Sequence, residues 1–315
     1  MTRILFFSLL ACNNTPKTDT LSPETETDTD TDTDTDTDTD TDTDTDTDTD
    51  TDTDTVDEQC VSAQVIVDAA NALLGSLDAD QESTIRFSMD DSERFTWSNL
   101  PPRTTPREGL SFDEMTPEQI VLAEALMQST LSVEGYQEAL GIMVIEEELE
   151  EDGDPNGGGE YYYFGIFDEP SLEVPWGWQL DGHHLAMNFT SVGCLFVMTP
   201  TLYGVSPKAV QRGDMAGFEP LADEVFLAED LLVSLTGKQE QASLLPGPGR
   251  LVAGPSYEGG LEPMGLLVSE LSNEQLQLLD SLVEAYVYDQ EGVYADWKMS
   301  EIRADYDETY LGWIG

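Results

Sequence analysis

Residues 175–190 read PWGWQLDGHHLAMNFT and contain both histidines of the chain. Aromatic and apolar residues dominate this stretch, which predicts a β-strand. Because successive side chains of a strand point to opposite faces, Asp181 and His183 should share one face while His184 points to the other. The adjacent histidines could share one small site only if a bulge at Gly182 re-aimed one of them. Any imidazole chemistry must occur in this segment.

Asp181 and His183 are the candidate catalytic pair, with His184 beside them. A carboxylate can orient an imidazole and raise its basicity for general-base catalysis, and the same two side chains could ligate a divalent metal ion. The structural alternative is that both side chains satisfy each other and nearby backbone groups within a sheet. Two histidines cannot complete a three-histidine zinc site.

Trp176 and Trp178 flank the same place. Aromatic faces beside polar residues commonly line ligand clefts, so both are candidates for a cleft lining. Their spacing of two residues puts them on one face of the strand together with Leu180. Packing into the core is the favoured alternative.

Three segments of the chain carry a family resemblance. They are residues 164–171 (FGIFDEPS), residues 175–190 and residues 198–204 (MTPTLYG). The chain resembles the uncharacterised family called domain of unknown function 3500 from about Val61 to the C-terminus. The resemblance implies no established reaction. Family members typically continue into a further segment with tyrosines, histidines and acidic residues, and the similarity fades over residues 310–315, which implies either a shortened member or a cut reading frame.

The sequence also resembles itself. Residues 73–82 (LLGSLDADQE) return as residues 231–240 (LLVSLTGKQE), and residues 109–119 (GLSFDEMTPEQ) return as residues 265–275 (GLLVSELSNEQ). Two echoes in the same order and at nearly the same spacing indicate two related halves, at about 61–215 and 216–315.

Each second echo holds a capping box, with Thr116 and Gln119 in the first half and Ser272 and Gln275 in the second. This pattern predicts that a helix begins there. The first half continues into predicted strands at 161–167, 178–190 and 195–199, whereas the equivalent strands of the second half would fall beyond Gly315. The sequence therefore predicts an α+β fold of two related halves of helices plus antiparallel sheet, with the second half incomplete.

The N-terminus has the order of an export signal: a basic residue at Arg3, an apolar run, and small residues before Cys12. Residues 9–12 (LLAC) resemble a bacterial lipobox, so we expect residues 1–11 to be a lipoprotein signal peptide and Cys12 to carry the lipid. Location in the cell envelope follows, at the outer membrane or cell surface, with the membrane as a partner through the lipid anchor.

Residues 12–55 hold almost no apolar side chains and become a strict Thr-Asp alternation, which cannot form a core. We expect a disordered tether there and a globular domain over 56–315. The formal net charge of the chain is −53. Such a surface repels phosphate backbones, which argues against nucleic acid as a partner.

Cys60 and Cys194 remain once Cys12 is assigned to the anchor. An oxidising compartment would allow a disulfide between them, and two free thiols are the alternative.

Asp152, Asp154 and Asn156 imitate the start of a calcium-binding loop, with Gly157 in sixth position. The twelfth position is Tyr163 instead of the bidentate glutamate, so a solvated acidic turn is favoured, and Glu146 to Glu151 add to its charge. The sequence lacks a phosphate loop, a nucleophile elbow and a Cys-x-x-Cys motif.

These patterns predict an exported, lipid-anchored protein with a hydrolase-like or metal-assisted activity around Asp181, His183 and His184. A divalent metal ion is the candidate cofactor. The competing hypothesis is a non-catalytic surface protein that binds a ligand or a partner.

Overall fold

A computed structural model describes residues 3–7, 53–245 and 263–314 of the chain. The helices are α1 (Thr53–Ser76), α2 (Ala79–Ile85), α3 (Pro117–Thr130), α4 (Val133–Glu151), α5 (Ala222–Ser234), α6 (Gly237–Ser243), α7 (Asn273–Val287) and α8 (Gly292–Ala304). The short 3₁₀ helices are η1 (Ser92–Phe95), η2 (Phe112–Glu114), η3 (Val268–Glu270) and η4 (Tyr306–Glu308). None of the described helices has both the length and the apolar character that crossing a bilayer requires.

The strands are β1 (Arg3–Phe7), β2 (Arg86–Phe87), β3 (Leu110–Ser111), β4 (Tyr163–Phe167), β5 (Trp176–Asp181), β6 (Leu185–Val192), β7 (Leu195–Tyr203), β8 (Leu266–Leu267) and β9 (Thr309–Trp313). The described strands form two sheets. The larger has the order β2-β4-β5-β6-β7, with β3 also paired to β4, and the smaller has the order β1-β9-β8. The predicted α+β class is confirmed.

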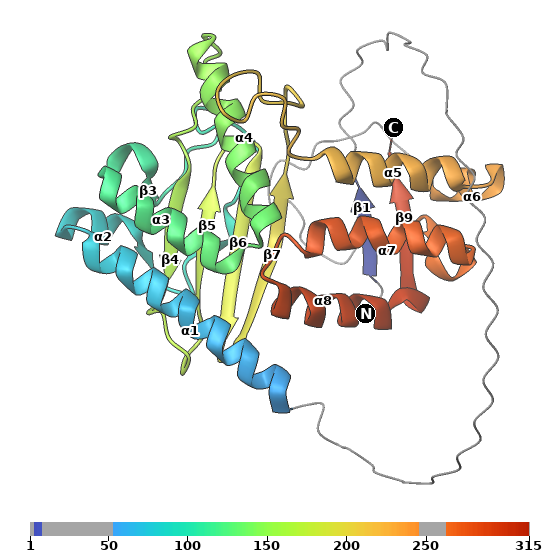
Figure 1. The fold of residues 1–315 in the computed structure, drawn as a ribbon, viewed down its shortest axis with the longest axis horizontal. Helices are drawn as coiled ribbons and strands as arrows, with labels where there is room; N and C mark the ends of the chain where they lie inside the picture. The colour runs from blue at the N-terminus through green and yellow to red at the C-terminus, as the bar shows by residue number, and fades with distance from the viewer. Residues whose placement is uncertain (1–2, 8–52, 246–262, 315) are drawn as a thin grey trace, which may run out of the picture.

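The helices lie in a layer over the sheets (Figure 1). α1, α3 and α4 cover one face of the larger sheet, and α5, α7 and α8 lie over the smaller one. Strands β4 to β7 are antiparallel, as predicted, whereas β2 runs parallel to β4. The capping boxes at Thr116 and Ser272 cap α3 and α7 as predicted, because each hydroxyl accepts a hydrogen bond from the backbone of the glutamine three residues on.

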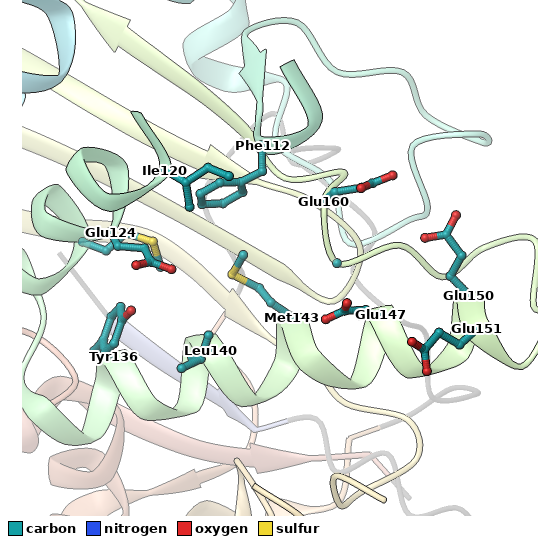
Figure 2. Close-up of a pocket in the computed structure, with 12 residues that line it drawn as sticks. Phe112, Ile120, Glu124, Tyr136, Leu140, Met143, Glu147, Glu150, Glu151 and Glu160 are labelled. Atoms are coloured by element: carbon teal, nitrogen blue, oxygen red, sulfur yellow. The ribbon is translucent and has the colours of Figure 1, made fainter. Parts of the chain in front are cut away.

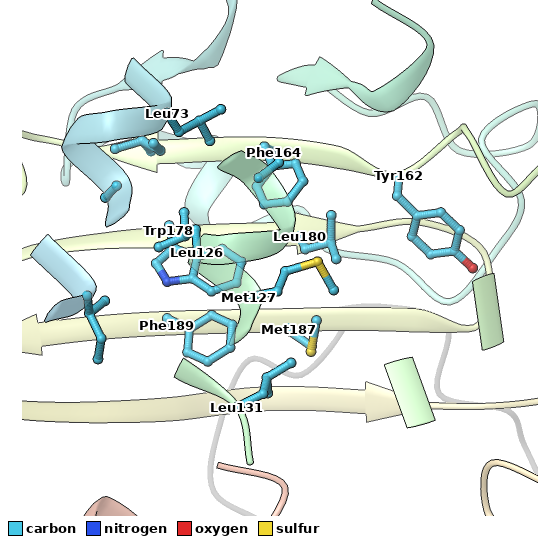
Figure 3. Close-up of a cluster of buried hydrophobic side chains, with 14 of the residues drawn as sticks. Leu73, Leu126, Met127, Leu131, Tyr162, Phe164, Trp178, Leu180, Met187 and Phe189 are labelled. Atoms are coloured by element: carbon cyan, nitrogen blue, oxygen red, sulfur yellow. The ribbon is translucent and has the colours of Figure 1, made fainter. Parts of the chain in front are cut away.

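The main core lies between the larger sheet and its helices (Figure 3). Trp178 stacks on Phe189 with ring centroids 4.0 Å apart and on Phe164 with centroids 5.8 Å apart. Trp176 and Trp178 are each 0% exposed. Burial of side chains of this size stabilises the fold by roughly 1.5–3 kcal/mol each. The candidate role of the two tryptophans as a cleft lining is therefore contradicted, and they pack in the core.

The two halves repeat the same glutamine bridge. The side chains of Gln81 in α2 and Gln119 in α3 exchange hydrogen bonds of 3.0 and 2.8 Å. Gln239 in α6 and Gln275 in α7 exchange hydrogen bonds of 2.9 and 3.0 Å. In each half, this amide pair joins the short helix to the long helix that follows it.

β9 takes the place in the second half that β4 has in the first. Leu266 of β8 lies opposite Leu311, as Leu110 of β3 lies opposite Phe164. The expectation that the second-half sheet would fall beyond Gly315 is therefore wrong for its first strand. The cause is a shorter connection, since α8 has 13 residues where α4 has 19, and η4 leads directly from α8 into β9.

β1 pairs with the edge of β9 that faces away from β8. In the first half, β5 pairs with the corresponding edge of β4, but β5 is antiparallel to β4 whereas β1 runs parallel to β9. Arg3 is opposite Thr309 and Phe7 is opposite Trp313. β1 comes from the predicted signal peptide. Cys12 and most of the predicted tether lie outside the described residues, and α1 already begins at Thr53.

A disulfide joins Cys60 in α1 to Cys194 in the turn between β6 and β7, with the two Cα atoms 4.5 Å apart. Of the two alternatives for these cysteines, the structure has the disulfide. It fixes α1 on the end of the larger sheet.

Candidate functional site

The histidines lie in a hairpin loop instead of a strand. β5 ends at Asp181, and the backbone N–H of Gly182 donates to the carbonyl of Leu185 at 2.9 Å, so β6 begins immediately after the turn. His184 has a φ of 64°, in the left-handed region that non-glycine residues rarely adopt. The single strand predicted over 178–190 is therefore interrupted, and the alternation that separated His183 from His184 does not apply.

The loop turns both imidazoles toward Glu146 of α4. The Nδ1 atom of His183 is 2.8 Å from one carboxylate oxygen of Glu146, and the Nδ1 atom of His184 is 2.7 Å from the other. The two rings stack with centroids 3.7 Å apart and an angle of 22° between their planes. One carboxylate thus holds two imidazoles side by side.

Glu146 is almost fully buried, with 1% of its side chain exposed, whereas the side chains of His183 and His184 are 16% and 19% exposed. Burial raises the pKa of Glu146, but its hydrogen bonds to both histidines and their charges outweigh burial and hold that pKa below its ordinary value. Glu146 is therefore ionised at neutral pH, and the outer edges of the two rings reach solvent.

The surrounding chain fixes the loop at several backbone atoms. The hydroxyl of Tyr162 donates to the carbonyl of His183 at 2.7 Å, and the N–H of Gly204 donates to the carbonyl of His184 at 2.7 Å. Figure 3 shows Tyr162 at the edge of the core cluster, where it links that core to the loop. A Cβ atom at Gly204 would lie 3.4 Å from the His184 ring and 3.5 Å from Oδ1 of Asn99, so Gly204 and Asn99 both lie close to His184.

Asp181 does not pair with His183, and this prediction is wrong. Its carboxylate accepts a hydrogen bond of 2.8 Å from Nε of Arg107 and one of 3.1 Å from the backbone N–H of Ser98. The physical reason is the alternation along β5, which points Asp181 away from α4, while the turn at Gly182 brings both histidines to the opposite side. Asp181 therefore binds Arg107 and Ser98, whereas Glu146 binds the two histidines.

Arg107 and Asp181 form a buried ion pair, with 1% and 2% of their side chains exposed. Burial raises the pKa of Asp181 to about 7, although Arg107 and the N–H of Ser98 both lower it. Arg107 also donates to the carbonyls of Leu100 at 2.7 Å and Gly182 at 3.1 Å. It therefore anchors the start of the histidine loop from the face of the sheet opposite α4.

The residues that imitate a calcium loop follow α4. Asp152 pairs with Arg212 at 2.8 Å, and Asp154 accepts a hydrogen bond of 2.9 Å from the backbone N–H of Asn156. Within the described residues, the clusters of close metal-ligating groups are Glu146 with His183 and His184, and a second group described below. The three loop residues belong to neither.

A cavity of about 370 Å³ lies between α3 and α4, on another side of α4 from the histidines. Figure 2 shows Phe112 and Met143 at its floor and glutamates at its rim, where Glu147, Glu150, Glu151 and Glu160 gather at one end. Aromatic and acidic side chains thus share one cavity. It does not include the histidine loop.

Sequence reasoning missed Glu146 and assigned its charge to the acidic turn. The signal was present, because Ala139, Ile142 and Glu146 recur at helical spacing and Glu146 therefore lies on the buried stripe of α4. A carboxylate on an apolar stripe needs a buried partner. Arg107 lies in a loop with no periodic pattern, so no comparable signal in the sequence indicated its burial.

The model of the family described as "Protein of unknown function (DUF3500)" matches residues 59–315, which is most of the chain. The chain belongs to the DUF3500 family. No curated protein and no solved structure matched this DUF3500 chain. The histidine loop and Glu146 both lie inside the part that matches the DUF3500 family, and the match itself assigns no activity.

Proposed function

We propose that Glu146, His183 and His184 bind a divalent transition-metal ion and that this DUF3500 protein uses the ion in a metal-assisted reaction such as hydrolysis. The observation that carries the proposal is the single buried carboxylate with an imidazole Nδ1 atom at 2.7 and 2.8 Å from its two oxygens.

The spacing of the ligand atoms supports a metal ion in place of the two protons that Glu146 shares with His183 and His184. Metal–nitrogen and metal–oxygen bonds of about 2.0–2.2 Å place neighbouring ligand atoms roughly 2.8–3.4 Å apart around one ion. Small movements of the two rings away from Glu146 would reach that spacing. The outer Nε2 atoms suit a shared ion less well, because the carboxylate of Glu146 lies beside the Nδ1 atoms instead.

The donor set narrows the class of metal. Two imidazoles and one carboxylate suit Zn²⁺ and Fe²⁺, and three protein ligands leave coordination positions open for water or a substrate. An ion bound in this way would act as a Lewis acid and lower the pKa of bound water. The side chains of His183 and His184 are partly exposed, so the proposed ion would lie close to the protein surface.

Titration of the purified full chain with Zn²⁺, in competition with a chromogenic chelator, tests the proposal. We expect one zinc ion per chain at the histidine site. The affinity should be at least 10-fold lower in His183→Ala and in Glu146→Gln, because loss of a residue that only supports a ligand already costs about 10–100-fold and these variants remove a ligand itself. Glu147→Gln is the matched control, since this residue is the neighbour of Glu146 on α4 but lines the cavity instead.

Equal zinc affinity in wild type and both site variants, with all proteins folded by circular dichroism, would refute the metal site. The carboxylate would then be a proton-sharing partner of two histidines. Hydrolytic activity is screened separately on the zinc-loaded wild type and the His183→Ala variant, so that loss of binding and loss of activity are distinguished.

The cavity between α3 and α4 supports a second function, binding of a small organic cation with an apolar body. Its volume of about 370 Å³ suits a small ligand, and carboxylates around an aromatic floor attract an ammonium group through charge and cation–π contact. This matches the alternative hypothesis of a ligand-binding surface protein.

Calorimetric titration with benzyltrimethylammonium, and with benzenesulfonate as an anion of similar size, tests this second function. Binding of the cation alone is expected, with a several-fold weaker affinity in Glu147→Gln/Glu150→Gln. Equal affinity in wild type and the double variant would exclude the cavity as the site.

Export and lipid anchoring through Cys12 remain part of the proposal. A lipobox-like sequence ahead of Cys12 and a disulfide between Cys60 and Cys194 support a location outside the cytoplasm. Cys12→Ser should move the protein from the membrane fraction to the soluble fraction of expressing cells. A distribution unchanged by the substitution would contradict the anchor.

A further inference from the structure

A second group of acidic side chains lies where the two halves of the fold meet. Glu138 comes from α4, Glu224 from α5, and Asp289 from the turn between α7 and α8. One carboxylate oxygen of each lies within 4.8 Å of the others. The three residues are distant in sequence, so the fold itself brings them together.

These carboxylates are withdrawn from water. Asp289 is 1% exposed and Glu224 is 3% exposed, while Glu138 is half-buried. Oε2 of Glu138, Oε2 of Glu224 and Oδ2 of Asp289 are buried and have no hydrogen-bond partner among the described residues. Buried polar atoms are normally satisfied, so three buried oxygens without a partner in one acidic group favour a cation there.

The charges around the group are negative. Burial raises the pKa of Glu138, and the carboxylates of Asp289, Glu224 and Asp223 raise it further. Burial also raises the pKa of Asp289, and it raises the pKa of Glu224 to about 7. Carboxylates this close cannot all stay ionised without a cation or shared protons.

We propose that Glu138, Glu224 and Asp289 bind a hard divalent cation of the calcium type between the two halves. An all-oxygen donor set favours Ca²⁺ over the transition metals that imidazoles attract. The Tyr203 hydroxyl lies near Asp289 and is a further oxygen beside the site. This site is independent of the histidine site on the same helix.

The surrounding backbone makes the site a junction. The N–H of Ser132, which caps α4, donates to the carbonyl of Asp289 at 2.8 Å, and the N–H of Glu291 donates to the carbonyl of Thr130 at 3.0 Å. A Cβ atom at Gly135 would lie 2.3 Å from the carbonyl oxygen of Asp289, so the two halves approach as closely as glycine permits. A cation here would bridge α4 and α5 across this contact.

The test uses Tb³⁺, a luminescent substitute for Ca²⁺, with the full chain. Tyrosine excitation should sensitise Tb³⁺ emission, because Tyr203 adjoins the site, and Ca²⁺ should displace the Tb³⁺. Saturating Ca²⁺ should also raise the Tm of the wild type by roughly 5–10 °C relative to KCl of equal ionic strength.

Both signals should be lost in Glu138→Gln/Glu224→Gln and kept in Glu229→Gln/Asp230→Asn, which changes two exposed acids of α5. His183→Ala should also keep them, which separates this site from the zinc site. The single variant Glu224→Gln serves if the double variant fails to fold. Equal Tb³⁺ emission and Ca²⁺ shifts in wild type and site variants, or no Ca²⁺ shift in the wild type, would overturn the proposal.

Discussion

At the scale of single residues, buried charged side chains hold the histidine loop from the two faces of the larger sheet. Glu146 holds two imidazoles from one side of the larger sheet, and Arg107 holds Asp181 and the carbonyl of Gly182 from the other. Glu146 and the Arg107–Asp181 pair thereby fix the loop from opposite faces of the sheet. The geometry of the imidazoles depends on both pairs, although only Glu146 touches them.

Arg107→Met should leave the buried carboxylate of Asp181 without its cation. We expect the free energy of unfolding to fall by about 3–5 kcal/mol, measured by urea unfolding with tryptophan fluorescence. Arg107→Met/Asp181→Leu removes both charges and should recover a large part of that loss. A double variant no more stable than the single one would show that the unpaired carboxylate of Asp181 does not cause the loss of stability.

The sequence located the site within one segment but placed its members wrongly. Alternation along a strand put Asp181 and His183 on one face, which is wrong because β5 ends at Asp181 and the chain turns at Gly182. His184 has a left-handed backbone in this turn, and no residue type at that position announces it. Glu146, 37 residues before His183, became a partner through the tertiary packing of α4 on the hairpin.

At the scale of elements, local patterns predicted more than long-range ones. Capping boxes are complete within four residues, so α3 and α7 began where the sequence placed them. The position of β9 depended on the length of the helix before it, and the echo could not supply that length. The glutamine bridges were not expected, because they join helices through side chains distant in sequence.

The glutamine bridge of the first half gives a prediction. Gln119→Ala should remove the hydrogen bond of 3.0 Å that Gln119 donates to the Ser76 carbonyl and both hydrogen bonds between Gln119 and Gln81. We expect a loss of about 1–3 kcal/mol in the free energy of unfolding. Gln137→Ala, an exposed position of α4, is the control and should change stability little. Calorimetry of both variants measures the difference.

The disulfide closes a long loop between α1 and the β6–β7 turn, since its cysteines are 134 residues apart. Cys60→Ser/Cys194→Ser should lower the free energy of unfolding by about 2–5 kcal/mol. The measurement is denaturant unfolding with and without a reductant. Reductant should then destabilise the wild type and leave the double variant unchanged; the reverse pattern would place the stabilisation elsewhere.

At the scale of the whole molecule, buried acids set the dependence of stability on pH. Glu224 and Asp181 have pKa values of about 7 in the folded state, above the ordinary values that they take when unfolded. The folded protein therefore binds more protons than the unfolded one at mildly acidic pH. Their stabilising contribution is complete at low pH and is lost as the pH rises through about 7.

Without divalent cations, the Tm should therefore fall between about pH 4 and about pH 7. Glu138→Gln/Glu224→Gln should flatten this slope, because it removes two of the groups that release protons. Glu229→Gln/Asp230→Asn changes the net charge equally and should keep the slope. A slope that is the same in both variants would attribute the effect to the overall charge of −53 instead of the buried acids.

β1 covers one side of β9 along its full length, from Thr309 to Trp313, and β1 lies within the predicted leader. Cleavage ahead of Cys12 would take β1 away and bare a row of main-chain donors and acceptors, which is a template for strand addition by another chain. A chain without residues 1–11 should self-associate at lower concentration than the full chain in light scattering. Cleavage of the signal peptide during export would then expose an edge of β9 with which a strand of another chain can pair.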